Sequence, residues 1–301
     1  MTFKQLEALF WIAHLGGFGP AAQKLHTTQS AISKRVHDLE SLFETQLFDR
    51  TQRTARLTEK GEEMFVLARR LLEQRDAAIE QFGKPEVIER RMRIGVTELT
   101  ALTWLHHLVE MIQSQYPKVI IEPDVDASVN LREKLLAEDL DIVFVPNAFA
   151  ETRLQTKPIG KTSSVWMCKP GYVEPGKVFQ LHELVAHRLL VQGGRRSGAG
   201  MLHSDWMKSQ GVQPTNTIVF NNLLAMIGLT VAGLGIGYLP EKCLGPMVKS
   251  GLLAVVPCTP AQPAVTYVAL YRGDIRSTLI SSIVVFAQKC CDFKQMIRLG
   301  S

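Results

Sequence analysis

Between residues 29 and 43, apolar side chains are spaced four, three and four residues apart, which places them on one face of an α-helix. These side chains are Ile32, Val36, Leu39 and Phe43. Polar side chains repeat on the opposite face, at Ser30, Ser33, Lys34 and His37. The pattern predicts an amphipathic helix with one buried face and one face free to contact a partner.

Two shorter helical segments precede this helix. Residues 3–15 carry apolar side chains at helical spacing and end at Gly16-Gly17, because glycine tolerates the left-handed conformation of many helix ends. Pro20 suits the first turn of the next helix, since its missing N–H would have no partner there. A hydroxyl of Thr27-Thr28 then suits the N-cap of the amphipathic helix. Three helices in this order, followed by a short wing, predict a winged helix-turn-helix that binds DNA.

A long amphipathic segment follows, from Thr58 to about Gly83. Its apolar side chains are spaced four, three, seven and four residues apart, at Met64, Ala68, Leu71, Ala78 and Phe82. Arg75 stands at the missing step, where a single polar residue can fix the register of two paired helices. Lys84-Pro85 ends the segment, because proline disfavours a helical residue before it. This helix either pairs with a second copy along that face or packs on its own domain.

From Arg93 onward, short apolar strands alternate with helices, which indicates parallel β-α-β units. A first set has strands at 93–97, 118–125 and 141–145, with helices over Thr100 to about Tyr116 and Leu131 to Ala137. A second set has strands at 163–168, 216–220 and 235–240, with helices over 202–209 and about 222–231. A strand at 265–271 and a helix from Ile275 to about Phe293 return to the first set. We therefore predict two α/β lobes joined by two crossing strands, with a ligand cleft at the carboxyl ends of the strands.

Composition narrows the functions further. The chain has 301 residues, 46% of them apolar, which is enough for more than one domain core. Its net charge is only +5, so DNA contacts must come from a few placed cations. No apolar run is long enough to span a bilayer, and because the first residues show no cationic segment followed by an apolar core, we expect no signal sequence. We expect a cytoplasmic protein without a membrane partner.

The pattern of cysteines and histidines argues against a metal site or a disulfide framework. The cysteines are odd in number and form no Cys-x-x-Cys pair: Cys168, Cys243, Cys258, Cys290 and Cys291. The eight histidines have no His-x-x-x-His spacing, and there is no Gly-x-Ser-x-Gly elbow. We expect no metal, no cofactor and no catalytic constellation, and so a protein that is not an enzyme.

The N-terminal residues resemble the winged helix-turn-helix of LysR-type transcriptional regulators. The matching residues are Ala21-Ala22, Leu25, Gln29-Ser30-Ala31-Ile32-Ser33, Leu39-Glu40, Leu47-Phe48-Asp49-Arg50 and Leu57-Thr58-Glu59-Lys60-Gly61. Two residues depart from the family pattern, which usually has proline where this chain has Ser30 and serine or threonine where it has Gly19. The length and layout of the rest of the chain are also similar to the family.

The resemblance implies an α/β fold class with an all-α winged helix-turn-helix over residues 1–60, a long dimerising linker helix over 61–84 and an effector domain over 85–301. That effector domain would resemble periplasmic solute-binding proteins, with lobe I over 91–161 and 266–301 and lobe II over 162–265. The implied partners are double-stranded DNA, a small-molecule effector and further copies of the chain in a homodimer or homotetramer. RNA polymerase is a further candidate partner.

The resemblance also places particular residues against DNA. Those expected in the groove are Gln29, Ser30, Ser33 and Lys34. The amide of Gln29 suits adenine, the ammonium group of Lys34 suits guanine, and the serine hydroxyls suit bases or phosphate. Arg50 and Arg53 of the wing would contact phosphate or the minor groove. His37 lies on the same helix face, and its alternative is a solvated surface position.

Polar residues near the ends of the predicted strands are candidates for the effector site. They are Thr97, Glu98, Thr100, Ser128, Gln192, Arg195, Arg196, Asn221 and Asn222. Thr100 is expected to cap a helix, and the backbone N–H groups at such a helix start could hold an anion. The two arginines could clamp an acidic effector. The alternative for each hydroxyl or amide is an ordinary cap or turn, and for the arginines a solvated loop.

We therefore predict a sequence-specific DNA-binding transcriptional regulator of LysR type, modulated by a small molecule bound between two α/β lobes. Two other hypotheses stay open. One is a redox-switched regulator that uses Cys168 or Cys243. The other is an α/β small-molecule-binding protein or enzyme whose N-terminal helices only mediate association.

Overall fold

The chain divides into two compact units, Met1–Gly83 and Lys84–Ser301. A computed structural model describes residues 1–49, 55–85, 88–193, 196–273 and 277–296. In these ranges no helix has both the length and the apolar character needed to cross a membrane. Each unit is described by itself.

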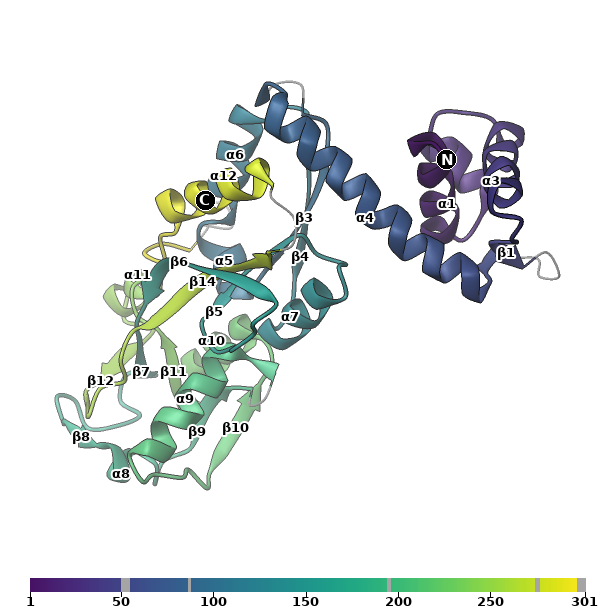
Figure 1. Cartoon of the computed structure of the whole chain (residues 1–301). Coiled ribbons are helices and arrows are strands. Elements are labelled where there is room, and N and C mark those ends of the chain that lie inside the picture. The colour runs from purple at the N-terminus through teal and green to yellow at the C-terminus, as the bar shows by residue number, and fades with distance from the viewer. Residues whose placement is uncertain (50–54, 86–87, 194–195, 274–276, 297–301) are drawn as a thin grey trace. The chain divides into compact units, whose positions relative to one another are not determined.

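The first unit packs short helices against one long helix, with a small two-stranded wing (Figure 1). Its elements are α1 (Phe3–Leu15), α2 (Phe18–Lys24), α3 (Gln29–Phe43), β1 (Phe48–Asp49), β2 (Arg56–Leu57) and α4 (Glu59–Phe82). α1 ends at Gly16 in the left-handed conformation that the sequence predicts. The hydroxyl of Thr28 accepts the N–H of Ala31 and so caps α3. The strands pair antiparallel, which confirms the winged helix-turn-helix.

The core of this unit joins one face of each helix. Ile32, Val36 and Leu39 of α3 are buried in it, as the spacing predicts. Phe43 was predicted for the same buried face, and that prediction is wrong because its side chain is 45% exposed. It is the last residue of α3 and lies beyond the residues that form the core.

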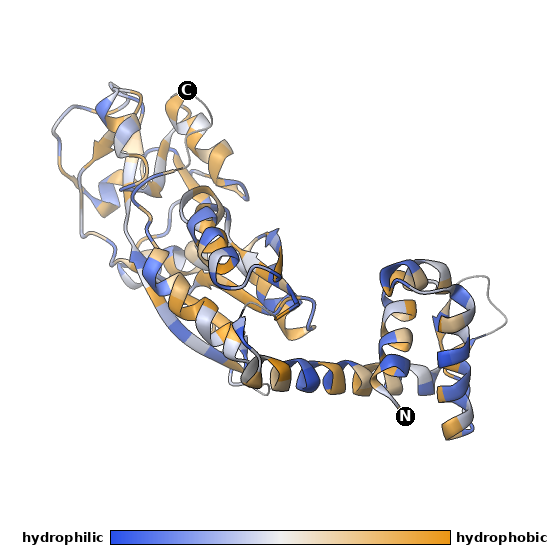
Figure 2. Ribbon diagram, turned by 90° about the horizontal axis from the view of Figure 1, so that it is seen from above, coloured by the Kyte–Doolittle hydropathy of each residue, from blue (hydrophilic) through white to orange (hydrophobic). Residues whose placement is uncertain are grey.

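α4 begins and ends within a residue of the helix predicted from Thr58 to about Gly83, and part of its apolar stripe packs within the unit itself. The ribbon alternates between apolar and polar residues along the helix (Figure 2). Ala68 is fully buried in the unit's own core, and Met64 and Leu71 pack against that core. Arg75 was expected to set the register of a paired helix, yet it forms an ion pair with Glu7 of α1, with the N and O atoms 2.6 Å apart. The first part of the stripe therefore packs within this unit.

The second unit contains two five-stranded sheets within its described residues. The first has the order β4-β3-β5-β14-β6, with strands Ile120–Val125, Arg91–Val96, Ile142–Pro146, Val265–Arg272 and Leu154–Thr162. The second has the order β10-β9-β11-β7-β12, with strands Thr217–Phe220, Leu189–Gln192, Ile236–Pro240, Ser164–Cys168 and Ala254–Val256. Two short strands, β8 (Phe179–Gln180) and β13 (Cys258–Thr259), pair with each other.

The predicted parallel units are confirmed within each sheet. β3 pairs parallel with β4 and β5, and β9 pairs parallel with β10 and β11. β14 and β7 pair antiparallel with their neighbours, so both sheets are mixed. The chain passes from β6 in one sheet to β7 in the other, and returns from β12 and β13 to β14. This double crossing is the predicted two-lobed architecture.

Helices cover both sheets. They are α5 (Glu98–Thr103), α6 (Leu105–Gln115), α7 (Ser128–Leu136), α8 (Leu181–Leu184), α9 (Gly198–Ser209), α10 (Leu223–Val231), α11 (Gly245–Lys249) and α12 (Thr278–Cys290). α7 packs on β5 and β14, α12 packs on α6 and β6, and α10 packs on the second sheet. The single helix predicted from Thr100 is two helices that meet at the fully buried Trp104.

Candidate functional site

The polar face of α3 is open to solvent. Gln29, Ser33, Lys34 and His37 are all exposed, opposite the buried apolar face of the helix. Lys34 forms no ion pair within the described part of the chain, so its ammonium group is available to a partner. The hydroxyl of Ser30 is exposed too, but it lies 3.0 Å from the hydroxyl of Thr28 and so joins the helix cap. Arg50 and Arg53, predicted for the wing, lie outside the described residues.

The start of the wing is anchored to α3 by one buried carboxylate. The Oε1 atom of Glu40 accepts the backbone N–H groups of Leu47 at 2.8 Å and Phe48 at 3.3 Å. Glu40 is only 7% exposed, so these bonds are formed away from water. The sequence identified Glu40 only as a match to the family pattern, because nothing in its spacing shows which backbone it will reach.

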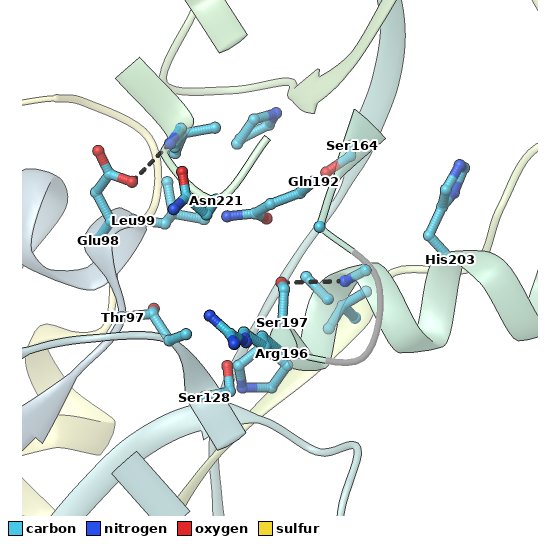
Figure 3. A pocket seen from close by; sticks show the side chains of 18 of the residues that line it. Thr97, Glu98, Leu99, Ser128, Ser164, Gln192, Arg196, Ser197, His203 and Asn221 are labelled. Carbon is cyan, nitrogen blue, oxygen red and sulfur yellow. Dashed lines mark hydrogen bonds between the residues drawn. The ribbon is translucent and has the colours of Figure 1, made fainter. Parts of the chain in front are cut away.

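A cavity of about 390 Å³ lies in the second unit, lined by residues from both sheets (Figure 3). Seven of the predicted effector residues line it: Thr97, Glu98, Ser128, Gln192, Arg196, Asn221 and Asn222. They stand at or after the carboxyl ends of β3, β4, β9 and β10, which is where ligands of open α/β sheets bind. Thr100 was also predicted, but it is fully buried within α5 and does not line the cavity. Arg195 lies outside the described residues.

The helix cap expected at Thr100 is also different in the structure. α5 begins at Glu98, with Thr97 at its N-cap, because the helix starts directly at the end of β3. The hydroxyls of Thr97 and Thr100 lie 3.3 Å apart, so Thr100 supports Thr97 from inside the helix. Thr97 is therefore the one of the two that faces the cavity.

Two of the lining residues have structural partners of their own. The carboxylate of Glu98 accepts the backbone N–H of Leu223 at 2.6 Å and of Leu224 at 3.3 Å. These groups are in the first turn of α10, so Glu98 joins the first-sheet side of the cavity to a helix of the second sheet (Figure 3). The side-chain oxygen of Asn222 accepts the N–H of Ala225 and caps the same helix. The side-chain oxygen of Asn222 therefore serves as an ordinary helix cap.

The charge of Asp126, the other acidic residue at the cavity, is compensated by partners within the chain. Burial alone would raise its pKa, but hydrogen bonds from Lys134, the N–H of Ala127 and Asn130 lower it below the usual value. The Lys134 ammonium group lies 2.8 Å from Asp126 and 2.7 Å from Asp124. The two carboxylates that line the cavity thus already have donors, whereas Arg196 has no ion-pair partner among the described residues.

Several lining residues were not predicted from the sequence. Ser164, Ser197, His203, Tyr238, Gln262 and Tyr267 also face the cavity. His203 lies inside α9 at an apolar, buried position, and Gln262 lies in a loop before β14. Neither residue follows a predicted strand, so neither could be predicted from the rule that ligands bind at the carboxyl ends of strands. Burial raises the pKa of Tyr267 to about 12, which keeps its phenol neutral.

The thiols are poorly suited to redox chemistry. Burial raises the pKa of Cys168 above its usual value and raises that of Cys243 to about 11. Burial likewise raises the pKa of Cys258 and Cys290 to about 11 and that of Cys291 to about 12. Because the thiolate is the reactive form, these residues should react slowly. The described residues also contain no cluster of His, Cys, Asp and Glu able to hold a metal ion.

Comparison with known protein families gives two matches that together span most of the chain. Residues 3–62 match the family described as bacterial regulatory helix-turn-helix protein, lysR family. Residues 86–289 match the LysR substrate binding domain. The first match covers α1, α2, α3, the wing and the start of α4, and the second covers both sheets of the second unit.

Curated relatives and solved structures agree with these matches. The transcriptional regulator MetR of Salmonella typhimurium is 24% identical over 300 residues, which is 99% of this chain and 93% of MetR. The regulator CzcR of Bacillus anthracis is 28% identical over 254 residues, covering 83% of this chain and 84% of CzcR. A full-length OxyR variant from Pseudomonas aeruginosa has a TM-score of 0.71 at 20% identity, covering 100% and 99% of the two chains. Full-length CbnR, solved with its target DNA, has a TM-score of 0.57 at 20% identity, covering 96% and 100%.

Proposed function

Because this chain belongs to the LysR family of DNA-binding, effector-responsive transcriptional regulators, we propose that the exposed face of α3 is the surface that reads its DNA site. The residues of this face are Gln29, Ser33, Lys34 and His37, with Ser30 at its start. An α-helix fits the major groove of B-DNA, where the edges of the four base pairs differ. The observation that carries the proposal is the exposure of this polar face opposite an apolar face that buries Ile32, Val36 and Leu39.

Each side chain has a role that its chemistry supports. The Gln29 amide can bond both N6 and N7 of adenine, and the Lys34 ammonium group can donate to O6 or N7 of guanine. Ser33 can bond either a base or a phosphate. Ser30 keeps its helix cap and acts mainly by ordering the first turn of α3. Arg50 and Arg53 are proposed to contact the DNA backbone or the minor groove, as the wing does in the family.

The experiment is a binding measurement on a DNA site that the full chain selects from a random library. Lys34→Ala should weaken binding to that site by about tenfold or more, since a base contact contributes about 1–3 kcal/mol. The melting temperature should stay within about 1 °C of the wild type, because an exposed side chain without an ion pair contributes little to stability.

The matched control is Lys118→Ala, which removes an exposed lysine from the second unit. It should leave the affinity for the selected site unchanged. Failure of the chain to select any site, or equal affinities for Lys34→Ala and the wild type, would contradict the proposal.

We also propose that the cavity of the second unit is the effector site. Two observations support this proposal. The cavity has a volume of about 390 Å³, within the usual range of small-molecule pockets, and residues from both sheets line it. An effector can change DNA binding only if it binds two arrangements of the protein with different affinities. A ligand that contacts both sheets would bind two arrangements with different affinities if the sheets move relative to each other.

A homo-oligomer is the third part of the proposal, because paired copies of α3 would read paired half-sites. It is supported by apolar side chains that stay exposed on α4: Val66, Leu67, Ile79 and Phe82. Phe82 is 85% exposed, which is unusual for a large aromatic side chain without a partner. We propose that α4 pairs with a second copy near its C-terminal end, where Ile79 and Phe82 are neighbours on one side of the helix.

A further inference from the structure

Gly19 is a glycine that neither the backbone conformation nor the packing of the first unit requires. It is the second residue of α2, and its φ angle lies outside the left-handed region. A Cβ atom placed on Gly19 would clash with no described residue, whereas one placed on Gly61 would lie 2.0 Å from the carbonyl oxygen of Leu47. Glycine also makes a helix less stable than alanine does. The stability of the fold therefore does not explain why residue 19 lacks a side chain.

Within the described part of the chain, one atom from beyond the backbone of α2 lies near this position, and it belongs to Gln29. The Oε1 atom of Gln29 is 3.9 Å from the place that a Cβ atom of residue 19 would occupy. Gln29 is the first residue of α3, and its side chain is exposed. No described residue forms a hydrogen bond with that side chain. Its amide group is therefore free to turn.

The direction of this amide decides which bases it can bond. With its oxygen and its NH2 group both toward the base, the amide accepts from N6 and donates to N7 of adenine. With only the NH2 group toward the base, it donates to acceptors that guanine and thymine also carry. An amide that can take up both orientations discriminates less between these bases than an amide that is held in one.

We propose that Gly19 is a specificity-determining residue: because it has no side chain, the Gln29 amide stays free to turn, and α3 accepts more than one base at the position that Gln29 reads. This inference rests on the proposed role of α3 in reading DNA. A serine at residue 19 would restrict the choice of base. Its hydroxyl lies one bond beyond the Cβ atom, which brings it within hydrogen-bonding distance of Oε1 when it points toward Gln29.

The test compares Gly19→Ser with Gly19→Ala in the full chain. Both variants remove the glycine and add a Cβ atom, so they differ only in the hydroxyl group. The wild type and each variant select sites from the same random library of duplex DNA. The selected sequences give, at each position, the ratio of the most frequent base to the second. Gln29→Ala identifies the position that Gln29 reads, because the ratio should fall there.

The wild type tests the inference without any change at residue 19. At the position that Gln29 reads, its ratio should be at most about tenfold, near the lower end of what a fixed bidentate contact gives. The ratio should be higher for Gly19→Ser than for Gly19→Ala by about threefold or more, which is the effect of one hydrogen bond. A larger wild-type ratio, or a smaller difference between the two variants, would overturn the inference.

A double variant separates this effect from a direct contact between the new hydroxyl and DNA. When Gly19→Ser is combined with Gln29→Ala, the hydroxyl stays and the amide is gone. The selected sequences should then match those of Gln29→Ala alone. A narrower choice of base that persists without the amide would show that the hydroxyl acts on DNA itself, and would overturn the role of residue 19 through Gln29.

The outcomes also separate this inference from the proposed function. If Gln29→Ala changes the preference at one position while the serine and alanine variants of residue 19 are alike, α3 reads DNA and the inference about Gly19 fails alone. If Gln29→Ala changes no position, Gln29 reads no base, which contradicts its proposed role and the inference together.

Discussion

At the scale of single residues, polar side chains in this protein act mainly through the helix ends that they meet. Thr28 and Asn222 cap α3 and α10 from within the chain's local sequence. Glu98 caps α10 from far away, since its partner Leu223 is separated from it by 125 residues. Polar residues at helix ends can thus cap a helix next to them in the sequence or, like Glu98, cap a helix far away in the sequence.

Glu98→Gln tests the contribution of the hydrogen bonds from the first turn of α10 to Glu98. The neutral amide keeps one acceptor oxygen but loses the charge that favours the N-terminus of α10, so the second unit should lose about 1–2 kcal/mol of unfolding free energy. The measurement is urea unfolding of the full chain followed by circular dichroism. Glu110→Gln is the control, because the Glu110 side chain is 72% exposed and its change should be near zero. Equal unfolding free energies of the two variants would show that the charge of Glu98 contributes nothing to stability.

The cysteines give a second prediction at this scale. With pKa values raised by burial, to about 11 for Cys243, less than about 0.1% of such thiols are ionised at pH 7.5. A thiol reagent should therefore react at least about tenfold more slowly with the native chain than with the chain in urea. Brief alkylation of the native chain should leave affinity for the selected DNA site unchanged. Rapid modification coupled to a change in DNA binding would favour the redox-switched hypothesis.

At the scale of helices and strands, the sequence predicts where elements occur better than which neighbours they choose. The bounds of α3 and α4 agree with their hydrophobic spacing because that spacing is local. The spacing also identifies an apolar face on α4, but it cannot say whether that face meets α1 of the same chain or α4 of another. The structure shows that Ala68 and Leu71 pack in the core of the first unit, which the spacing alone could not predict.

The exposed apolar part of α4 gives the prediction at this scale. Phe82→Glu places a charge where the proposed helix pair buries an aromatic ring, so it should shift the oligomer toward single chains. Light scattering should give at least twice the 33.6 kDa of one chain for the wild type and a lower mass for the variant at the same concentration. Phe82→Leu keeps an apolar side chain and should keep the wild-type mass. A monomeric wild type, or a Phe82→Glu protein of unchanged mass, would contradict pairing through this residue.

At the scale of the whole molecule, the division into two units corresponds to two kinds of chemistry. The first unit has an exposed polar helix face, which we propose reads DNA, and the second encloses a cavity lined from both of its sheets. Lining residues that follow a strand, such as Thr97 and Asn221, could be predicted because parallel strands end at a common edge. His203 and Gln262 could not, since a helix interior and a loop carry no sequence signal for the cavity that they reach.

The central claim is that the exposed face of α3 lies against DNA in the complex. The most direct measurement is photocrosslinking of the full chain to its selected DNA site, with benzoylphenylalanine placed either at Ser33 on that face or at Lys118 in the second unit. Our account predicts crosslinks from position 33 to bases within the selected site, lost when unlabelled site DNA competes, and none from position 118. Absence of crosslinks from position 33 in a complex that still forms with wild-type affinity would contradict the account.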